Sequence, residues 1–362
     1  MLTRRHFLKR AGVLAGGLLT GRFARAGGEK WFMPHEGALH ERSWMAFGAS
    51  PGIWGRELVD EARRSLAAIA RAVSRYEPVS MLVRPREIGL AREWVGDRVE
   101  LIPCPLDDLW IRDSGPVFVV SQTGEKAAVD FNFNGWGNKQ THARDARVAK
   151  LVTARAGVKS LETPLVLEGG GVETDGQGTA LIAESCVLNP NRNPGMSKTR
   201  FEELIKPLLG IEKIIWLPGV RGQDITDGHV DFYARFARPG VVLAGLDPDP
   251  ASLDHEISRR HLEILASATD ARNRRLHIIV IEGPRTGREW FDSPDFAAGY
   301  MGFYVCDGAV IMQEFGDSRA DTAARAAIQR AFPGRIVEPV NADGLAAGGG
   351  SVHCATQQEP RV

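Results

Sequence analysis

Five segments with helical periodicity recur along this chain of 362 residues, and short β-branched runs flank each of them. In residues 57–76 the apolar side chains return at the spacing of one helix face, at Leu58, Ala62, Leu66, Ile69 and Val73. The similar helical segments are residues 142–156, 197–209, 252–269 and 319–332. The runs that predict strands are residues 79–83, 117–120, 180–183, 214–217, 241–244, 277–281, 309–312 and 336–340.

The segments repeat in the order strand, strand, helix, strand, at a spacing of roughly 55–85 residues. A doubly wound parallel sheet would alternate strands and helices more densely, and would carry one phosphate loop after a strand. The excess of strands favours repeated β-β-α-β units arranged around an axis. We therefore expect an α/β fold with a functional site where the units converge.

The composition is that of an ordinary globular protein, with 43% hydrophobic and 25% charged residues. Lys+Arg and Asp+Glu balance at 45 each, so net charge gives no support to a nucleic-acid partner. Six of the basic residues lie in residues 1–26, which contain no acid, so the remainder carries 39 basic and 45 acidic residues. That mild acidity favours a cationic ligand.

The N-terminus predicts a twin-arginine export signal over residues 1–26. Residues 3–9 match the twin-arginine pattern, a weakly apolar run follows over residues 11–21, and residues 24–26 offer an Ala-x-Ala cleavage site. The alternative is a basic amphipathic tail. The apolar run is too short to span a bilayer. We expect residues 30–362 to form a single domain that is soluble after cleavage, lacks a membrane partner and lies in the periplasm or outside a bacterial cell.

Four cysteines are present, at Cys104, Cys186, Cys306 and Cys354, and their spacings form neither a CxxC pair nor a zinc pattern. The sequence therefore predicts no metal site. The first three lie in apolar surroundings, and we interpret them as inert core thiols.

Cys354 follows three glycines in residues 348–358, on a segment that resembles a β-strand. Glycines permit unusual backbone angles and a close approach to substrate. Nothing local can activate the thiol, so the partners of a nucleophilic Cys354 must come from distant segments, of which residues 110–116 and 228–231 stand out. The alternatives are a structural or exposed cysteine, or an amide hydrolase with a Cys-His pair.

His229 and Asp231 are the first candidate partners. Residues 230–236 alternate apolar and polar side chains like a strand, which would place His229 and Asp231 on one polar face. Asp227 lies just upstream and makes the loop more acidic, so it is a candidate substrate-binding residue. The alternative is a satisfied surface histidine beside an unrelated aspartate.

Asp113 lies in a polar corner over residues 110–116. A carboxylate binds two parallel N–H groups of a guanidinium in directional, charge-assisted hydrogen bonds. Trp110 could supply a flat face to the cation. The alternatives are an ordinary ion pair between Arg112 and Asp113 in a turn, and a core role for Trp110.

Glycines follow Glu168 in residues 168–171 and recur in residues 175–178, after a predicted short strand over residues 165–167. The Lys-Ser/Thr pair of a phosphate-binding loop is missing, so we interpret the glycines as turns. Glu168 is then a candidate partner for His229. Two aspartates beside a cysteine and a histidine suit chemistry on a guanidinium. A peptide-bond hydrolase does not require the two aspartates.

These motifs resemble those of the agmatine deiminase and bacterial-type peptidyl-arginine deiminase family. The matching segments are collinear, cover nearly all of residues 31–360, and are residues 110–116, 133–137, 167–170, 226–231 and 348–358. The family belongs to the guanidine-modifying superfamily. The resemblance implies the pentein-like fold of that superfamily, a five-bladed pseudo-symmetric α/β propeller of ββαβ units, and an enzyme without a cofactor.

The resemblance also implies a role for each candidate. Cys354 would attack the guanidinium carbon, Asp113 and Asp231 would hold its nitrogens, and His229 would move protons. Glu168 would position or charge His229. A covalent thiouronium intermediate would yield a ureido group and ammonia, most simply from agmatine to N-carbamoylputrescine in putrescine biosynthesis.

Some positions depart from the family pattern. Gly37 stands where an aromatic residue is common, Phe47-Gly48 replaces a Trp-Pro pair, and Ala355 follows the cysteine where isoleucine is common. These changes leave the chemistry intact and concern the tail of the substrate.

Peptidyl-arginine and free arginine therefore remain alternative substrates, with Arg144 or Arg192 as candidate partners for a carboxylate or peptide backbone. The sequence is also compatible with amidino transfer to an amine, and with a non-catalytic propeller that binds polyamines. It leaves the oligomeric state open, a homo-oligomer included.

Overall fold

Five separate β-sheets make up the described part of the chain, and helices cross over or cover them. The computed structural model describes residues 29–289, 291 and 295–362. The predicted export signal lies outside these residues. Within them, none of the helices combines the length and apolarity needed to cross a bilayer.

The strands form two four-stranded and three three-stranded sheets. The sheet that includes the C-terminal strand has the order β17 (Gln357–Pro360), β2 (His40–Phe47), β3 (Val79–Val83) and β4 (Val99–Pro103). The second has the order β1 (Trp31–Phe32), β5 (Val117–Ser121), β6 (Lys126–Val129) and β7 (Lys159–Leu161). The others comprise β8 (Val172–Thr174), β9 (Thr179–Ala183) and β10 (Lys213–Leu217); β11 (Ala234–Arg238), β12 (Val241–Leu246) and β13 (His277–Glu282); and β14 (Tyr304–Cys306), β15 (Ala309–Gln313) and β16 (Ile336–Val340).

Helices of two kinds connect these strands. The longer ones are α1 (Pro51–Val73), α2 (Ile88–Val95), α5 (Val148–Ala156), α7 (Lys198–Leu209), α8 (Leu253–Ser267) and α9 (Ser318–Ala331). The short ones are α3 (Ile111–Ser114), α4 (Gly135–Asn138), α6 (Glu184–Val187) and α10 (Asp343–Ala346). Single 3₁₀ turns are η1 (Pro85–Glu87), η2 (Asp145–Arg147), η3 (Gly169–Gly171), η4 (Val230–Phe232) and η5 (Tyr300–Gly302).

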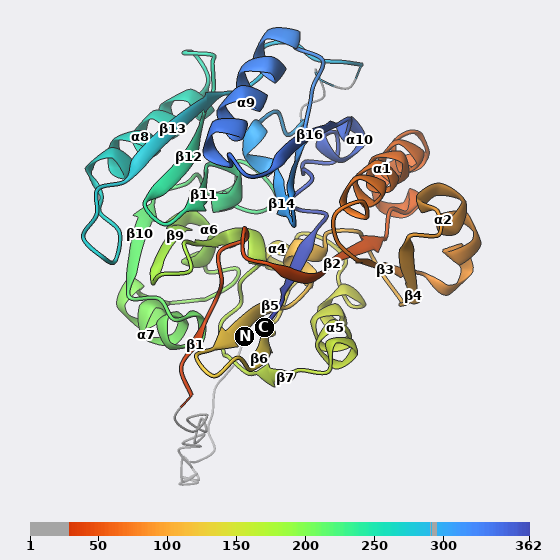
Figure 1. Cartoon of the computed structure of the whole chain (residues 1–362), viewed down its shortest axis with the longest axis horizontal. Coiled ribbons are helices and arrows are strands. Elements are labelled where there is room, and N and C mark those ends of the chain that lie inside the picture. Colours follow the sequence, from red (N-terminus) through yellow and green to blue (C-terminus); the bar gives the residue numbers. More distant parts are fainter. Residues whose placement is uncertain (1–28, 290, 292–294) are drawn as a thin grey trace, which may run out of the picture.

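Four sheets contain the same order of connections, in which an antiparallel pair comes first and a helix then crosses over to a parallel strand, as in β8–β9 followed by α7 and β10. In the fifth sheet the antiparallel partner of β2 is β17, from the C-terminal end of the chain. The crossovers through α1, α5, α8 and α9 likewise join parallel strands, because a parallel pair needs a long connection. Figure 1 shows the sheets around the middle of the molecule and the longer helices around the outside.

The five predicted helices are confirmed as α1, α5, α7, α8 and α9. Helix α1 begins earlier than predicted, at Pro51, but is interrupted at Gly55, where φ is +67°. Along α1 the predicted face is buried except at Leu58, and Val59 takes its place in the core. Burial of this apolar face, rather than helix propensity alone, stabilises the helix.

The predicted strands are confirmed with small changes at their ends, but three extended segments are not strands. Residues 165–167 join no sheet, and Leu167 makes a single backbone bond to Phe131. Residues 230–232 form the turn η4, and β11 begins only at Ala234. The amides of Phe232 and Tyr233 donate to the His229 and Val230 carbonyls within this turn, so they are not available to a strand partner.

The third predicted extended segment that is not a strand contains Cys354. Residues 352–355 form a turn with backbone bonds from Ala355 to Val352 and from Thr356 to His353. Strand β17 begins only at Gln357 and pairs antiparallel with β2, with Gln357 opposite Trp44. Cys354 therefore lies in the turn directly before β17, rather than within a strand.

Candidate active site

The four predicted reactive side chains come from separate segments. Asp113, His229 and Asp231 meet at Gly170, and Cys354 lies near enough to both aspartates for their charges to raise its pKa. Asp113 lies in α3, His229 directly precedes η4, Asp231 lies within η4, and Cys354 lies in the turn before β17. All four are at most 8% exposed. The Arg112 amide donates to the Cys354 carbonyl at 3.2 Å, which joins the cysteine turn to the segment that carries Asp113.

Gly170 occupies the centre of the group. A Cβ atom at this position would lie 2.6 Å from His229 Nδ1, 2.9 Å from Asp231 Oδ2 and 3.1 Å from Asp113 Oδ1. The absence of a side chain here lets three functional groups approach one another. The glycines of residues 169–171, predicted as a turn, form the 3₁₀ turn η3, and residues 175–178 turn between the antiparallel strands β8 and β9.

Asp113 is oriented by two donors. Trp136 Nε1 donates to Oδ2 at 2.9 Å, and the Gly170 amide donates to Oδ1 at 3.1 Å. Trp136 has a φ of +55°, which is uncommon for a bulky residue and stores strain in α4. Burial raises the pKa of Asp113, as do the nearby carboxylates, against the lowering effect of His229.

His229 lies between carboxylates. Its Nε2 is 3.2 Å from Glu168 Oε2, and its Nδ1 is 3.7 Å from Asp113 Oδ2. Burial would lower the pKa of His229, but Asp113, Cys186 and Glu168 together raise it well above the ordinary value. The imidazole is therefore protonated at neutral pH and can act as a proton donor.

Glu168 confirms its predicted contact with His229 and has a second partner that the sequence did not indicate. Arg192 Nε lies 2.8 and 3.0 Å from the two Glu168 oxygens, and both side chains are buried. Burial would raise the pKa of Glu168, but His229 and Arg192 lower it. Arg192 is thus already occupied, and the expectation that it could bind a substrate carboxylate is wrong.

Asp231 has one occupied and one unoccupied carboxylate oxygen. Oδ2 lies 2.6 Å from His353 Nδ1. Within residues 29–289, 291 and 295–362, Oδ1 is buried and has no hydrogen-bond partner. A buried acceptor without a donor is unfavourable by roughly 1–3 kcal/mol. This oxygen is therefore placed to receive a donor from a ligand.

The Cys354 thiol has Ser351 as its hydrogen-bonding neighbour, with Sγ 3.3 Å from Oγ. Burial raises the pKa of Cys354 to about 12, with further contributions from Asp231 and Asp113. A cation between the two carboxylates would offset their effect on the thiol. The arrangement thus suits a cationic ligand.

Two further candidates lie beside this group. The Trp110 ring lies 5.6 Å from that of Trp54, and Gly350 packs so closely on it that a Cβ would be 2.3 Å away. Trp110 therefore has a core role, since it supports the glycine segment before Cys354. Arg112 does not pair with Asp113, because it turns toward Gln358 and Glu36.

Asp227 lies in the loop before His229 and is occupied on both oxygens. Arg192 and Lys139 each lie 2.8 Å from Oδ2, and the Gly222 amide donates to Oδ1. Burial would raise the pKa of Asp227, but these partners lower it to about 2. Asp227 thus ties the His229 loop to Arg192 and is not brought to Cys354.

Glu168, Cys186 and His229 also have the residue types and spacing of metal ligands. Cys186 is buried in a hydrophobic core, as predicted, and burial raises the pKa of its thiol. Its Sγ also lies 3.6 Å from Glu168 Oε2. Both Glu168 oxygens already face the Arg192 guanidinium, whose charge disfavours a second cation. We therefore assign this cluster to the control of His229.

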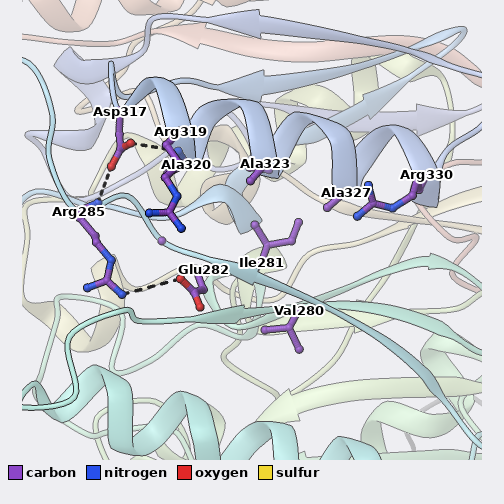
Figure 2. A pocket seen from close by; sticks show the side chains of 12 residues that line it. Val280, Ile281, Glu282, Arg285, Asp317, Arg319, Ala320, Ala323, Ala327 and Arg330 are labelled. Carbon is purple, nitrogen blue, oxygen red and sulfur yellow. Dashed lines mark hydrogen bonds and ion pairs between the residues drawn. The ribbon is translucent and has the colours of Figure 1, made fainter.

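A cleft of about 540 Å³ lies elsewhere, between β13 and α9. Figure 2 shows Val280 and Ile281 of β13 facing Ala323 and Ala327 of α9, with arginines toward the ends. Its lining includes the carboxylates of Glu282 and Asp317. Glu282 pairs with Arg285, and Asp317 accepts from the amides of Arg285 and Ala320, so we do not take this cleft as the reactive site.

The chain is similar to known proteins over most of its length. A sequence-family model described as Porphyromonas-type peptidyl-arginine deiminase matches residues 32–360. A provisionally named agmatine deiminase of Streptomyces coelicolor is 44% identical over 342 residues, covering 91% of this chain and 99% of the relative.

Solved structures are similar over almost the same length. The agmatine deiminase of Enterococcus faecalis aligns with a TM-score of 0.86 and 31% identity, covering 92% of this chain and 96% of that one. A provisionally named arginine deiminase of Porphyromonas gingivalis aligns with a TM-score of 0.81 and 27% identity, covering 91% and 98%.

Replacement of Gly170 by alanine should remove activity without unfolding the protein. The added methyl group would displace Asp113, Asp231 or His229, and a misplacement of about 1 Å can lower kcat/KM by about 100-fold. Steady-state kinetics and a thermal melt measure both effects. The control is Gly89→Ala in α2, where nothing lies within 4 Å of the new Cβ; equal loss in both variants would contradict this role for Gly170.

Replacement of Glu168 by glutamine should move the alkaline limb of the pH–rate profile to lower pH. The charge of Glu168 helps to raise the pKa of His229, so its removal lets the imidazole lose its proton earlier as pH rises. Glu203→Gln on the exposed face of α7 should leave the limb in place. An unchanged alkaline limb of the pH–rate profile in Glu168→Gln would show that Glu168 does not control the pKa of the proton donor.

Proposed function

The chain belongs to the Porphyromonas-type peptidyl-arginine deiminase family, and we propose that it hydrolyses the guanidinium of agmatine to a ureido group with release of ammonia. The observation that carries this proposal is that Asp113, His229 and Asp231 meet at Gly170, near enough to Cys354 for both aspartates to raise its pKa. Among the described residues, one buried Asp231 oxygen has no partner. A planar cation with several N–H donors could donate a hydrogen bond to that oxygen and offset the surrounding negative charge.

In the proposed reaction, Asp113 and Asp231 bind the guanidinium nitrogens and hold its carbon against Cys354. The sulfur attacks this carbon, and His229 gives its proton to the departing amino group, which leaves as ammonia. The resulting S-alkylthiouronium is then attacked by water, whose proton returns to His229, and the C–S bond breaks. The products are N-carbamoylputrescine and the free thiol.

Two effects support substrate-dependent activation of the thiol. Burial and the two aspartates raise the pKa of Cys354 to about 12, so the empty site disfavours the thiolate. A bound guanidinium would offset part of the negative charge of the two carboxylates and favour ionisation of the thiol. The same carboxylates would fix the reacting carbon in place, and such positioning lowers the barrier by converting a bimolecular step into one within the complex.

Agmatine is favoured over free arginine because it has no carboxylate. Arg192 is fully occupied by Glu168 and Asp227. Arg144 has an exposed side chain and lies 3.5 Å from Asp107. Peptidyl-arginine is the second candidate, supported by the description of the family that matches residues 32–360. The prediction that no cofactor is needed stays a prediction.

The finer fold prediction enters the same proposal. We take the five sheets as blades of one pseudo-symmetric propeller and residues 30–362 as a single catalytic domain. This is supported by the shared ββαβ order and by the pairing of the C-terminal strand β17 with β2.

A panel of agmatine, arginine and arginine peptides tests the substrate. Purified protein should release ammonia and a ureido product from agmatine. Cys354→Ala should lower turnover by about 10⁴-fold or more while agmatine still binds. Asp113→Asn should lower kcat/KM by about 10²–10³-fold, since it removes charge stabilisation at the reacting carbon. Turnover by Cys354→Ala, or the absence of wild-type activity toward all three substrates, would refute the proposal.

Export by the twin-arginine pathway is a separate proposal that rests on residues 1–26. Bacteria that express the full chain should accumulate a mature form outside the cytoplasm, cleaved after Ala26. Mass spectrometry of the periplasmic and culture fractions measures the N-terminus. Replacement of Arg4 and Arg5 by lysine should keep the uncleaved protein inside; unchanged export would contradict the proposal.

A further inference from the structure

His353 precedes the nucleophile in the chain, but its side chain turns away into a buried cluster of charges. Its Nδ1 lies 2.6 Å from Asp231 Oδ2, and its Nε2 lies 2.8 Å from Glu36 Oε2. All three side chains are at most 6% exposed. The imidazole thus bridges a substrate-facing carboxylate and a carboxylate deeper in the fold.

Each ring nitrogen of His353 faces one carboxylate. Burial would raise the pKa of Glu36, but Arg235 and His353 hold it well below the ordinary value. Burial would also raise the pKa of Asp231, but the hydrogen bond with His353 lowers it. The His353 ring thus favours the ionised form of both carboxylates.

Glu36 is a fixed anchor for this ring. The Val305 amide donates to its Oε1 at 2.8 Å, and Arg235 forms an ion pair with the same oxygen at 2.8 Å. Arg112 donates to Oε2 at 3.2 Å. Because these partners come from α3, β11 and β14, Glu36 cannot rotate without breaking contacts to three parts of the fold.

The two carboxylate oxygens of Asp231 therefore have different environments. His353 occupies Oδ2, and Oδ1 is left buried and unpaired among the described residues. We propose that His353 is a positioning residue, which holds Asp231 so that this single oxygen faces the substrate guanidinium. The inference rests on the proposed function, since it assigns the group that orients one of its two carboxylates.

The hydrogen bond with His353 also affects the charge of Asp231. Asp113 and Asp231 both lie against Gly170, and two nearby carboxylates repel each other. The bond between His353 Nδ1 and Asp231 Oδ2 lowers the pKa of Asp231 and so favours its ionised form. Without the ring, Asp231 would lose this partner.

The backbone of His353 is held independently of its side chain. Its amide donates to the Gly302 carbonyl at 2.9 Å, and its carbonyl accepts from Arg112 Nε at 3.3 Å. Replacement of the ring can therefore change Asp231 while Cys354 stays in its turn. This separates the proposed role from a general requirement for the loop.

Two amide replacements divide the functions of the two nitrogens. The side-chain nitrogen of asparagine stands near the place of Nδ1, so His353→Asn can still donate to Asp231. The nitrogen of glutamine stands near the place of Nε2, so His353→Gln can still reach Glu36 but not Asp231. The pair is matched in chemistry and differs in which carboxylate it serves.

The experiment measures kcat, KM for agmatine and the melting temperature of purified wild-type, His353→Ala, His353→Asn and His353→Gln proteins. His353→Ala should lower kcat/KM by about 100-fold, with KM raised and kcat lowered. His353→Asn should recover at least about tenfold of that loss, and His353→Gln should not, although its melting temperature is no lower. The exposed His277 of β13, changed to glutamine, is the control and should leave both constants unchanged.

A purely structural role would lower the active fraction and therefore kcat, with KM unchanged. Activity that follows melting temperature, or that recovers in His353→Gln as well as in His353→Asn, would overturn this inference alone. Absence of turnover by the wild-type protein on every guanidine substrate would overturn the proposed function and this inference together.

Discussion

The pairing of β17 with β2 is the constraint on which the site depends most. Gln357–Pro360 add to the edge of a sheet whose other strands lie more than 250 residues earlier in the chain. This ladder fixes the turn that carries Cys354, and the bond from the Arg112 amide to the Cys354 carbonyl attaches that turn to α3. The nucleophile and the carboxylate of Asp113 are therefore placed by the closure of the fold, since no local motif connects them.

Buried negative charge is the second organising feature. Removal of a carboxylate from water is unfavourable unless partners replace the lost hydration. Glu168 is paired with Arg192 and His229, Glu36 with Arg235 and His353, and Asp113 with the Trp136 indole and the Gly170 amide. Among the residues that the structure describes, Asp231 has a hydrogen-bond partner on Oδ2 and none on Oδ1. In the proposed function, the guanidinium of the substrate would supply the donor that this oxygen lacks.

The sequence predicted the elements with long apolar periods and missed those that depend on distant partners. Helix α1 could be predicted because Leu66, Ile69 and Val73 repeat at a spacing that only a helix buries on one side. The alternation of residues 230–236 predicts a strand, but the Tyr233 amide bonds to the Val230 carbonyl and closes a turn instead. The apolar neighbours of Cys186 in sequence predict its burial in the core but not its contact with Glu168.

The types of reactive residue were therefore determined by the sequence itself: a cysteine after glycines, a Gly-His-x-Asp segment and an acidic corner, in an order that resembles one family. Which of their partners matter was decided only by the tertiary structure. Glu36 and His353 lie 317 positions apart, and neither carries a local sign that it belongs to a charged cluster. Periodicity records which face of an element meets the core, since neighbours along the chain share that geometry. Hydrogen bonds between distant side chains leave no such periodic trace, because they depend on where separate sheets meet.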